Sequence, residues 1–183
     1  MASTSFPILQ TERLILRQVI EQDSEDILSY LSDERVMKYY GMSPFTSLQE
    51  ALDEIDWYQS IYDAKVGIRW GISFENQDKI IGSCGFHNWD KRHHRAEIGF
   101  ELSSEFWGIG IMQEALQTII PFGFQEYKIN RIQALVEPDN TSSRKLLKRM
   151  GFHEEGLLVQ YEYTVGKYDD LYMLALLRKV YEK

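Results

Sequence analysis

Residues Ala96 to Ala115 constrain the fold of this chain more than any other stretch. Apolar and polar residues alternate from Ala96 to Leu102, as in a half-buried β-strand. A short turn with glycines at positions 108 and 110 follows, and an amphipathic helix begins at Ile111. Glycines let the backbone approach a ligand closely, and the free amides at a helix start bind phosphate. The stretch therefore predicts a strand–loop–helix unit that can hold a pyrophosphate, although such a turn also occurs without a ligand.

The remaining sequence alternates between helical and extended patterns. Helix starts are marked by a capping box at Ser47 and Glu50 and by capping residues near positions 23–24 and 139–140. Strands are indicated by period-two alternation or by short apolar runs. These strand patterns cover residues 11–17, 70–74, 79–87, 96–102, 131–137, 154–163 and 169–177.

In this order, the elements predict a mixed α/β, or α+β-like, fold. The strands between residues 70 and 102 are expected to form an antiparallel meander, and a β-α-β-α-β tail follows. The helix that begins at residue 111 is expected to end near Glu126, and Pro121 is expected to kink or shorten it, because proline removes a backbone donor. No repeat or flexible linker interrupts the pattern, so we expect a single domain over residues 1–183.

The charge balance bears on the partners of the chain. With 20 basic and 28 acidic residues the net charge is −8. A nucleic-acid partner would require a basic surface, so none is expected. The same balance favours a cationic partner such as an amine.

Other features indicate the compartment and the absence of a metal. Residues 1–7 lack the basic and apolar regions of a secretion signal, and the apolar run Leu171–Leu177 is too short to span a bilayer. We therefore expect a cytoplasmic protein with no membrane partner. The single cysteine, Cys84, cannot form an intramolecular disulfide and is interpreted as a core residue. The histidines lack zinc-site spacing and are interpreted as turn residues, so no metal is expected; they are His87, His93 and His94.

Two common phosphate-binding motifs do not fit the glycine turn. A Walker loop requires Gly-Lys-Ser/Thr, which is absent. A dinucleotide-binding loop requires a third glycine where Gln113 stands. A third possibility, an acetyl-CoA loop, is implied by the family resemblance that the following motifs carry.

Motifs spread along nearly the whole chain carry a family resemblance. They are Thr-Glu-Arg-Leu-x-Leu-Arg at 11–17, Asp-Glu-Arg-Val-Met-Lys-Tyr at 33–39, Ala-Glu-Ile-Gly-Phe at 96–100, the loop 107–112, Asn-Thr-Ser-Ser-Arg at 140–144 with Leu146-Leu147 and Met150-Gly151-Phe152, Glu155-Gly156, and Tyr168-Asp169-Asp170. In this order and spacing, they resemble the ribosomal-protein-alanine N-acetyltransferase (RimJ/RimL-like) branch of the GNAT superfamily.

The resemblance implies a GNAT-type acyl-CoA N-acyltransferase fold, with a central, mostly antiparallel twisted sheet of about six to seven strands flanked by helices. Its parallel pair, residues 96–102 and 131–137, would splay at the carboxyl ends. The pantetheine arm of acetyl-CoA would pair with backbone groups there, and the pyrophosphate would bind the loop amides. The residues implied for cofactor binding are Leu102, Ser103, Trp107, Gly108, Ile109, Gly110, Ile111, Met112, Asn140 and Ser143.

Two loop positions depart from the family pattern. Trp107 stands where Gln or Arg is usual, and Met112 stands where Gly or Ala is usual. The first change removes one phosphate contact, and the second crowds the last backbone position. Arg144, Lys145 or Lys148 are alternative phosphate ligands, or simply solvated residues of a helix face.

The implied reaction needs a proton acceptor, since an amine must be neutral to attack a thioester. An α-amino group has a pKa of about 8 and a lysine of about 10.4, so a carboxylate is expected to take the proton directly or through water. Glu97 is the leading candidate and Glu155, by its match to the family, the second. Ser143 is the candidate donor to the departing sulfur. Each has a plainer interpretation, as a solvated strand carboxylate or, for Asn140 and Ser143, as helix-start residues.

The sequence thus predicts an acetyl-CoA-dependent N-acetyltransferase that acts by direct attack in a ternary complex. The expected acceptor is a primary amine, foremost a protein amino terminus. Two alternatives stay open: acetylation of a small cationic amine such as a polyamine or aminoglycoside, and a non-catalytic acyl-CoA-binding module. The chain is expected to be a monomer or homodimer.

Overall fold

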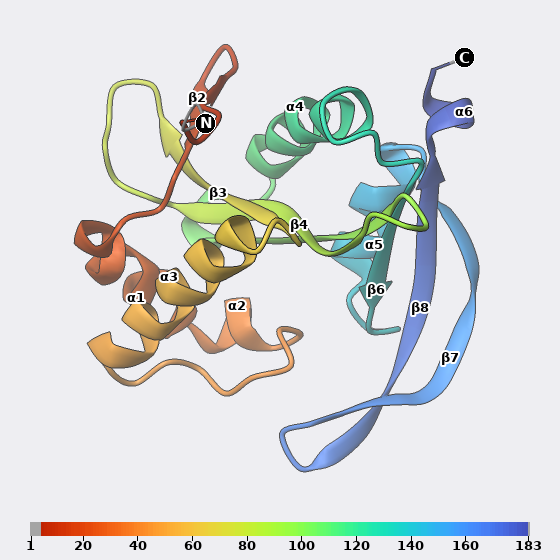
Figure 1. Ribbon diagram of the computed structural model, residues 1–183. Coiled ribbons are helices and arrows are strands. Elements are labelled where there is room, and N and C mark those ends of the chain that lie inside the picture. The colour runs from red at the N-terminus through yellow and green to blue at the C-terminus, as the bar shows by residue number, and fades with distance from the viewer. Residues whose placement is uncertain (1–4, 183) are drawn as a thin grey trace.

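The computed structural model describes residues 5–182; residue 183 and residues 1–4, part of the segment expected to lack a secretion signal, lie outside that range. The strands form one eight-stranded sheet in the order β1-β2-β3-β4-β5-β6-β8-β7 (Figure 1). Their bounds are β1 (Leu9–Gln10), β2 (Leu14–Arg17), β3 (Ile68–Phe74), β4 (Gly82–Asp90), β5 (Arg95–Leu102), β6 (Arg131–Val136), β7 (His153–Thr164) and β8 (Lys167–Leu177).

Six α-helices and two short 3-10 helices accompany the sheet within the described residues. They are η1 (Glu21–Asp23), α1 (Ser24–Leu31), α2 (Glu34–Met37), α3 (Leu48–Asp63), η2 (Ser104–Phe106), α4 (Ile111–Gln125), α5 (Thr141–Arg149) and α6 (Arg178–Tyr181). None of these helices is long and apolar enough to cross a membrane.

The strand topology confirms the predicted mixed fold. Strands β3, β4 and β5 form the expected antiparallel meander, and β5 and β6 are the parallel pair. The sheet has one strand more than the expected six to seven because Leu9 and Gln10 add β1, which pairs with Leu16 and Ile15 of β2. The β5–β6 ladder ends after Glu97↔Gln133, although both strands continue. The parallel pair therefore diverges toward its carboxyl ends.

Two of the three predicted helix starts follow the expected capping chemistry; at α1 the N-cap residue is Asp23, but its carboxylate binds Arg17 and makes no capping hydrogen bond. Ser47 and Glu50 form the capping box of α3, and the Asn140 side chain accepts a hydrogen bond from the Ser143 amide at the start of α5. Helix α4 runs past Pro121 to Gln125, so the expected end near Glu126 is confirmed and the proline does not shorten the helix. Apolar residues on both sides of the proline are buried, and this packing offsets the lost backbone bond.

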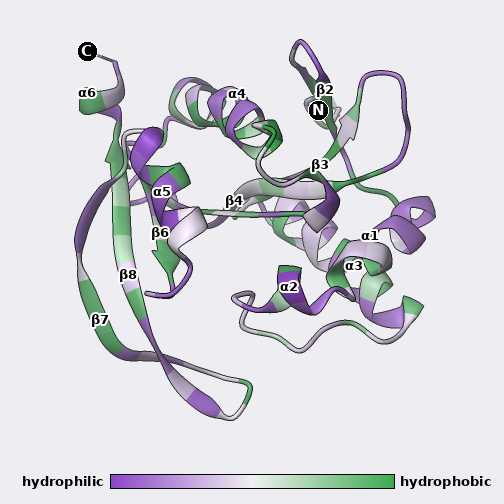
Figure 2. Ribbon diagram, turned by 180° about the vertical axis from the view of Figure 1, so that it is seen from behind, coloured by the Kyte–Doolittle hydropathy of each residue, from purple (hydrophilic) through white to green (hydrophobic). Residues whose placement is uncertain are grey.

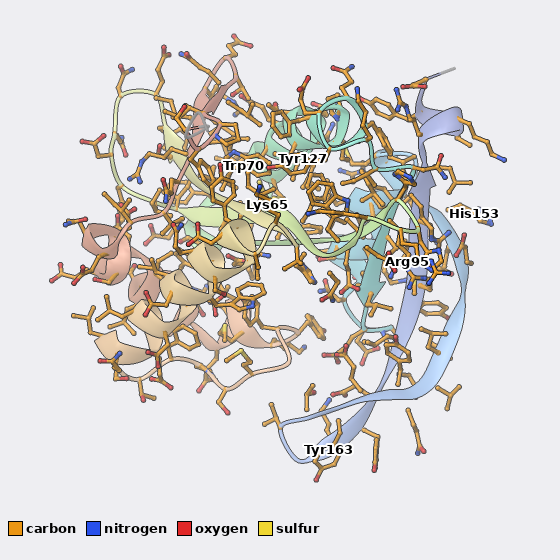
Figure 3. The ribbon with its side chains drawn as sticks, in the orientation of Figure 1. Lys65, Trp70, Arg95, Tyr127, His153 and Tyr163 are labelled. Atoms are coloured by element: carbon orange, nitrogen blue, oxygen red, sulfur yellow. The ribbon has the colours of Figure 1, made fainter. Side chains whose placement is uncertain are left out.

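The two faces of the sheet differ in chemistry. On the face covered by α4, Trp70, Cys84 and Ile98 belong to the larger hydrophobic core. Phe122 of α4 packs on Trp70 and on Tyr127, with ring centroids 5.5 and 5.3 Å away. Trp70 and Tyr127 are labelled in Figure 3. Hydrophobic and hydrophilic stretches alternate along α4, as an amphipathic helix on a core requires (Figure 2).

The opposite face, covered by α3, carries polar side chains from the same strands. Arg69 of β3, Ser83 of β4 and Glu101 of β5 are all buried there. Helices α1 to α3 form a second, smaller core among themselves. Since strand residues alternate between faces, one face of the meander is available for packing and the other for a functional site.

Strands β7 and β8 form a long hairpin that extends from the body of the protein (Figure 1). Its distal part returns toward the segment after α2, where a Cβ on Gly41 would lie 3.4 Å from a Thr164 methyl group. The hairpin thus flanks the region into which the odd-numbered residues of β5 point.

Candidate active site

A cavity of about 510 Å³ opens where β5 and β6 diverge. Residues from five parts of the chain line it: the segment after α2, α3, the polar face of β3 to β5, the end of β6 and the start of α5. These residues are Tyr39, Tyr40, Met42, Glu54, Trp57, Arg69, His87, Glu97, Ile98, Gly99, Phe100, Glu101, Ala134, Leu135, Val136, Glu137, Asn140 and Ser143. The cavity brings together two of the three predicted catalytic residues, Glu97 and Ser143.

Glu97 and His87 form a hydrogen-bonded pair in this cavity. They lie opposite each other in the β4–β5 ladder, with His87 Nε2 3.1 Å from Glu97 Oε1. The His87 Nδ1 atom is buried and has no partner among residues 5–182. If Nε2 carries the proton it donates to an ionised Glu97, and the second carboxylate oxygen is free for another donor. The arrangement fits a carboxylate that receives a proton from a substrate.

His87 therefore corrects an interpretation made from sequence. It lies within β4 and not in a turn, whereas His93 and His94 do lie in the turn between β4 and β5. No group of three or more His, Cys, Asp or Glu side chains in the described part of the chain is arranged to hold a metal ion.

Gly99 makes room for the polar side chains beside Glu97. A Cβ on Gly99 would lie 2.7 Å from Arg69 Nη1 and 3.2 Å from His87 Cε1. Any side chain at this position would displace one of them. The glycine two residues after Glu97 is therefore a steric requirement of the site.

A buried ion pair forms the floor of the cavity. The side chains of Arg69 and Glu101 are 4% and 3% exposed and bind each other directly. Arg69 Nε donates to Ser83 Oγ over 2.6 Å, and Ser83 donates to Glu101. Glu101 shares the polar face with Glu97, as strand alternation predicts, but its charge is balanced by Arg69. This network fixes the geometry of the floor.

Further carboxylates make the surroundings of the cavity acidic. Glu54 accepts a hydrogen bond from Tyr40 Oη over 2.9 Å. Burial and the charge of Asp169 raise the pKa of Glu137. Burial, followed by the charges of Glu97 and Asp169, raises the pKa of Glu162 on the hairpin. Such crowding of negative charge favours a bound cation.

The wall on the β6 side ends at the start of α5. Asn140 caps this helix, with its Oδ1 3.2 Å from the Ser143 amide, so the expected capping role of Asn140 is confirmed. The Ser143 hydroxyl has no hydrogen-bond partner within residues 5–182 and lines the cavity. It is available as a donor to a group bound between β5 and β6.

The backbone of β5 offers hydrogen-bonding groups to the gap. Ser103 donates its amide to Ile81 across the β4–β5 ladder, so the alternation of that ladder turns the backbone groups of Phe100 and Leu102 away from β4. Exposed backbone groups were expected at Ser103, but both are paired, since the Ser103 carbonyl also accepts a hydrogen bond from the Phe106 amide over 3.0 Å. The Leu102 carbonyl accepts the Trp107 indole N–H over 2.8 Å. The backbone groups left to hydrogen-bond an extended ligand are thus those of Phe100 and the N–H of Leu102.

The glycine turn leads directly into α4. Gly108 and Gly110 have φ values of +79° and +83°, in the left-handed region where glycine is favoured. The first amide to bond back into the turn is that of Glu114, to the Gly110 carbonyl. The amides of Ile111 and Met112 have no backbone partner in the described residues, while both side chains are buried in the core. The turn thus presents free amides and a positive helix end for an anion.

The structure places other predicted residues away from the cavity. Both oxygens of Glu155 are held by Arg131, at 2.8 and 2.6 Å. This hydrogen bonding lowers the pKa of Glu155, and Glu155 is not among the residues that line the cavity. Arg144 and Lys148, the alternative phosphate ligands, both bind Glu154 instead.

Sequence reasoning missed several cavity residues that come from distant segments. Arg69, Glu54 and Trp57 lie in a strand and a helix to which no function was assigned. His87 could have been found, because an antiparallel meander with the correct register places it opposite Glu97. Predicting the register requires the conformation of the turn between β4 and β5, because the strand pairing is irregular between His87 and Asp90.

A splayed parallel pair, a helix start with free amides and a cavity with a carboxylate define the class of an acyl-CoA-dependent N-acyltransferase. A family profile described as acetyltransferase (GNAT) domain matches residues 13–153. The chain belongs to the GNAT acetyltransferase family and is an acetyl-CoA-dependent N-acetyltransferase.

Known proteins similar to the chain cover most of its length. The uncharacterized N-acetyltransferase YoaA of Bacillus subtilis (strain 168) is 42% identical over 161 residues, 88% of this chain and 91% of the relative. The ribosomal protein uS5-alanine N-acetyltransferase of Escherichia coli (strain K12) is 28% identical over 180 residues, which cover 92% of this chain and 89% of the relative. The structure of RimL, a ribosomal L7/L12 α-N-protein acetyltransferase in complex with coenzyme A, has a TM-score of 0.82 at 23% identity. The match covers 93% of this chain and 98% of the RimL chain. This last similarity is one of fold.

Proposed function

We propose that the chain transfers the acetyl group of acetyl-CoA to a primary amine, foremost the α-amine of a protein amino terminus. One observation carries the proposal: Glu97 and Ser143 line the same cavity at the point where β5 and β6 diverge. A relative named as a ribosomal protein uS5-alanine N-acetyltransferase supports the choice of a protein acceptor.

Glu97 accepts the proton of the acceptor amine in this proposal. Acetyl-CoA supplies the thioester: the amine nitrogen forms a bond to its carbonyl carbon, and the carbon–sulfur bond breaks. The amine proton passes to Glu97, directly or through water. His87 donates to the other oxygen of Glu97 and holds the carboxylate toward the cavity. The acidic surroundings attract the amine as an ammonium ion before it loses its proton.

Ser143 assists the departing thiolate. Its hydroxyl lies on the β6 side of the cavity, on a helix start whose dipole favours negative charge. A thiol has a pKa of about 8.5, so a hydrogen bond to the thiolate strengthens as charge develops on sulfur. Phe100 and Leu102 hold the pantetheine arm by backbone pairing, and the residues 108–112 hold the pyrophosphate.

A small cationic amine is the second candidate acceptor. The carboxylates of Glu54, Glu97 and Glu137 all line the cavity, together with the aromatic side chains of Tyr39 and Trp57. Carboxylates and aromatic faces together are suited to a polyamine.

Thiol release from acetyl-CoA tests the proposal. The purified protein is offered peptides with free amino termini, the same peptides with blocked termini, and spermidine. Release with free but not blocked peptides supports the proposal, and release with spermidine alone selects the second candidate. Binding of acetyl-CoA by calorimetry with no release from any amine would contradict both and indicate a binding module.

A further inference from the structure

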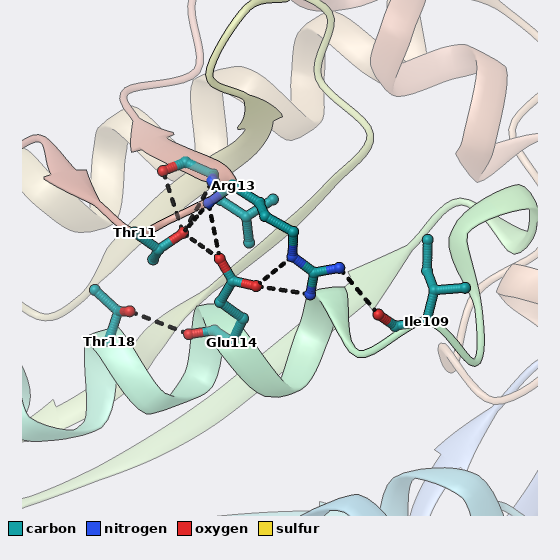
Figure 4. Close-up of polar contacts among 6 residues, drawn as sticks. Thr11, Arg13, Ile109, Glu114 and Thr118 are labelled. Atoms are coloured by element: carbon teal, nitrogen blue, oxygen red, sulfur yellow. Dashed lines mark hydrogen bonds and ion pairs between the residues drawn. The ribbon is translucent and has the colours of Figure 1, made fainter.

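The motif Thr-Glu-Arg at positions 11–13 contacts the glycine turn. The segment precedes β2, yet its side chains meet α4 about a hundred positions later in the chain. Arg13 donates from Nε to Glu114 Oε2 over 2.7 Å, and its Nη2 lies 2.6 Å from the same oxygen (Figure 4). The Arg13 amide donates to Glu114 Oε1 over 3.1 Å, and the Thr11 hydroxyl also donates to that oxygen.

The remaining nitrogen of Arg13 binds the turn itself. Nη1 donates to the carbonyl of Ile109, the residue between the two glycines, over 3.2 Å. The Ile109 side chain is 55% exposed, so packing does little to hold this residue. Within residues 5–182, the hydrogen bond from Arg13 is the one that restrains the Ile109 carbonyl, and with it the peptide unit between Ile109 and Gly110.

This restraint sets the direction of an amide. In a trans peptide the carbonyl and the following N–H point in opposite directions. With the Ile109 carbonyl held by Arg13, the Gly110 N–H points away from Arg13. A left-handed Gly110 can rotate readily, so without the contact this amide has no fixed direction.

Glu114 is a rigid anchor for the guanidinium. It sits in the first turn of α4, and its side chain is 20% exposed. Burial acts to raise the pKa of Glu114, but hydrogen bonds from Thr11 and Arg13 outweigh it and lower the pKa. The carboxylate is therefore ionised at neutral pH and holds Arg13 in one orientation.

We propose that Arg13, anchored by Glu114 and Thr11, is a positioning residue that sets the phosphate-binding conformation of residues 108–112. The proposal rests on the proposed binding of acetyl-CoA at this turn. Arg13 acts on the carbonyl side of the turn, and so supports phosphate binding in a protein that has Trp107 in place of a basic residue.

The test compares the KM values of two thioesters: acetyl-CoA, which carries the pyrophosphate, and S-acetylpantetheine, which lacks it. Arg13→Ala should raise the KM for acetyl-CoA about tenfold, as expected for loss of one hydrogen bond from a charged group, with kcat little changed. The KM for S-acetylpantetheine, which has no pyrophosphate, should stay the same. Arg13→Lys should recover part of the loss, since it keeps the charge but not the forked geometry.

Arg17→Ala is the matched control. Arg17 belongs to the same motif, and its two terminal nitrogens bind Asp23 at 2.8 Å each, away from the turn. This variant should lower the melting temperature and leave both KM values unchanged. An equal rise in both KM values for Arg13→Ala, or the same rise for Arg17→Ala, would overturn the proposal.

Glu114→Ala separates positioning from direct phosphate contact. Positioning predicts weaker acetyl-CoA binding, because the guanidinium loses its anchor. If Arg13 instead contacted the phosphates directly, Glu114→Ala should bind acetyl-CoA equally well or more tightly, because a nearby negative charge is removed. That result would overturn the proposal. Calorimetry on the unsubstituted protein tests the proposed function separately. If this protein binds no acetyl-CoA, the proposed function is wrong, and the positioning role of Arg13 is wrong with it.

Discussion

The two ends of the proposed acetyl-CoA site, the turn before α4 and the cavity where β5 and β6 diverge, use different parts of the polypeptide. At the turn before α4, two glycines have positive φ and the backbone offers free amides, while the side chains of Ile111 and Met112 belong to the core. At the other end, the cavity offers polar side chains: Glu97 is paired with His87, and the buried pair of Arg69 and Glu101 lies beside them.

The difference separates two kinds of substrate recognition. An amide-lined turn holds a group of fixed charge, which suits a pyrophosphate common to all acyl-CoA molecules. A cavity lined by side chains changes with each substitution, which suits an acceptor that differs among relatives. Changes at the first end should therefore alter the affinity for acetyl-CoA, and changes at the second should alter turnover and acceptor choice.

The largest expected effect is that of Glu97→Gln. The substitution keeps the shape of the side chain but removes the proton acceptor, so kcat near neutral pH should fall roughly 10²–10⁴-fold. Raising the pH should recover part of the rate, because more of the acceptor amine is already neutral. Steady-state kinetics from pH 6 to 10 measures this, and calorimetry should show unchanged acetyl-CoA affinity.

Glu155→Gln is the control for that experiment. Its oxygens are held by Arg131 outside the cavity, so turnover should change little. If Glu155→Gln instead showed the pH profile expected of Glu97→Gln, the assignment of the base would be reversed.

Glu101→Ala should cause the largest loss of stability. It would leave the Arg69 guanidinium buried without its partner, at a cost of about 3–5 kcal/mol. Urea unfolding measures the change. Adding Arg69→Met should restore part of the lost stability, and a loss below about 1 kcal/mol for the single variant would show that the floor is not held by this pair.

Gly110→Asp should weaken acetyl-CoA binding about 10–100-fold, through like-charge repulsion at the turn. Gly110→Ala is the matched control, because it shares the unfavourable φ of +83° without the charge. Its Cβ would lie 3.6 Å from Arg13 Nη2, which is ordinary contact. Equal acetyl-CoA affinities of the two variants would show that charge repulsion does not cause the weaker binding.

Ser143→Ala should lower kcat about tenfold and leave acetyl-CoA affinity nearly unchanged, because the lost hydrogen bond matters most as charge develops on sulfur. Single-turnover and binding measurements separate the two quantities. Normal turnover with a lower melting temperature would assign Ser143 to the stability of α5 alone.

The smallest expected effect is that of Arg131→Gln. Its ion pair with Glu155 is partly exposed, so stability should fall by less than about 1 kcal/mol. Hydrogen bonding to Arg131 lowers the folded-state pKa of Glu155 below its unfolded value of about 4.3. The stabilisation is thus present above about pH 4.3 and disappears as the pH falls through the folded pKa. Melting curves of both proteins should converge in acid, and divergence there would contradict the assignment.

The fold was predictable because alternation and caps act locally. The pattern from Ala96 to Leu102, the capping box at Ser47 and the Asn140 cap all lie where expected. The end of α4 near Glu126 was predicted, but the effect of Pro121 was not, because whether a helix runs through a proline depends here on the packing of α4 against the sheet.

The site was predictable only in part. Glu97 and Ser143 were found through motifs, and the cavity contains both. The pairing of Glu97 with His87 depends on strand register, and the contact of Arg13 with Ile109 depends on tertiary packing. Neither the register nor the packing can be read from local residue patterns.

The most direct test of the separation between the two ends is the double variant Gly110→Asp with Glu97→Gln. Steady-state kinetics is measured for both single variants and the double variant. Independent ends predict that the losses in log kcat/KM add, within about 0.5 kcal/mol when expressed as free energy, with KM for acetyl-CoA altered only by Gly110→Asp. A coupling above about 1 kcal/mol, or a rise in the KM for acetyl-CoA caused by Glu97→Gln alone, would contradict the account.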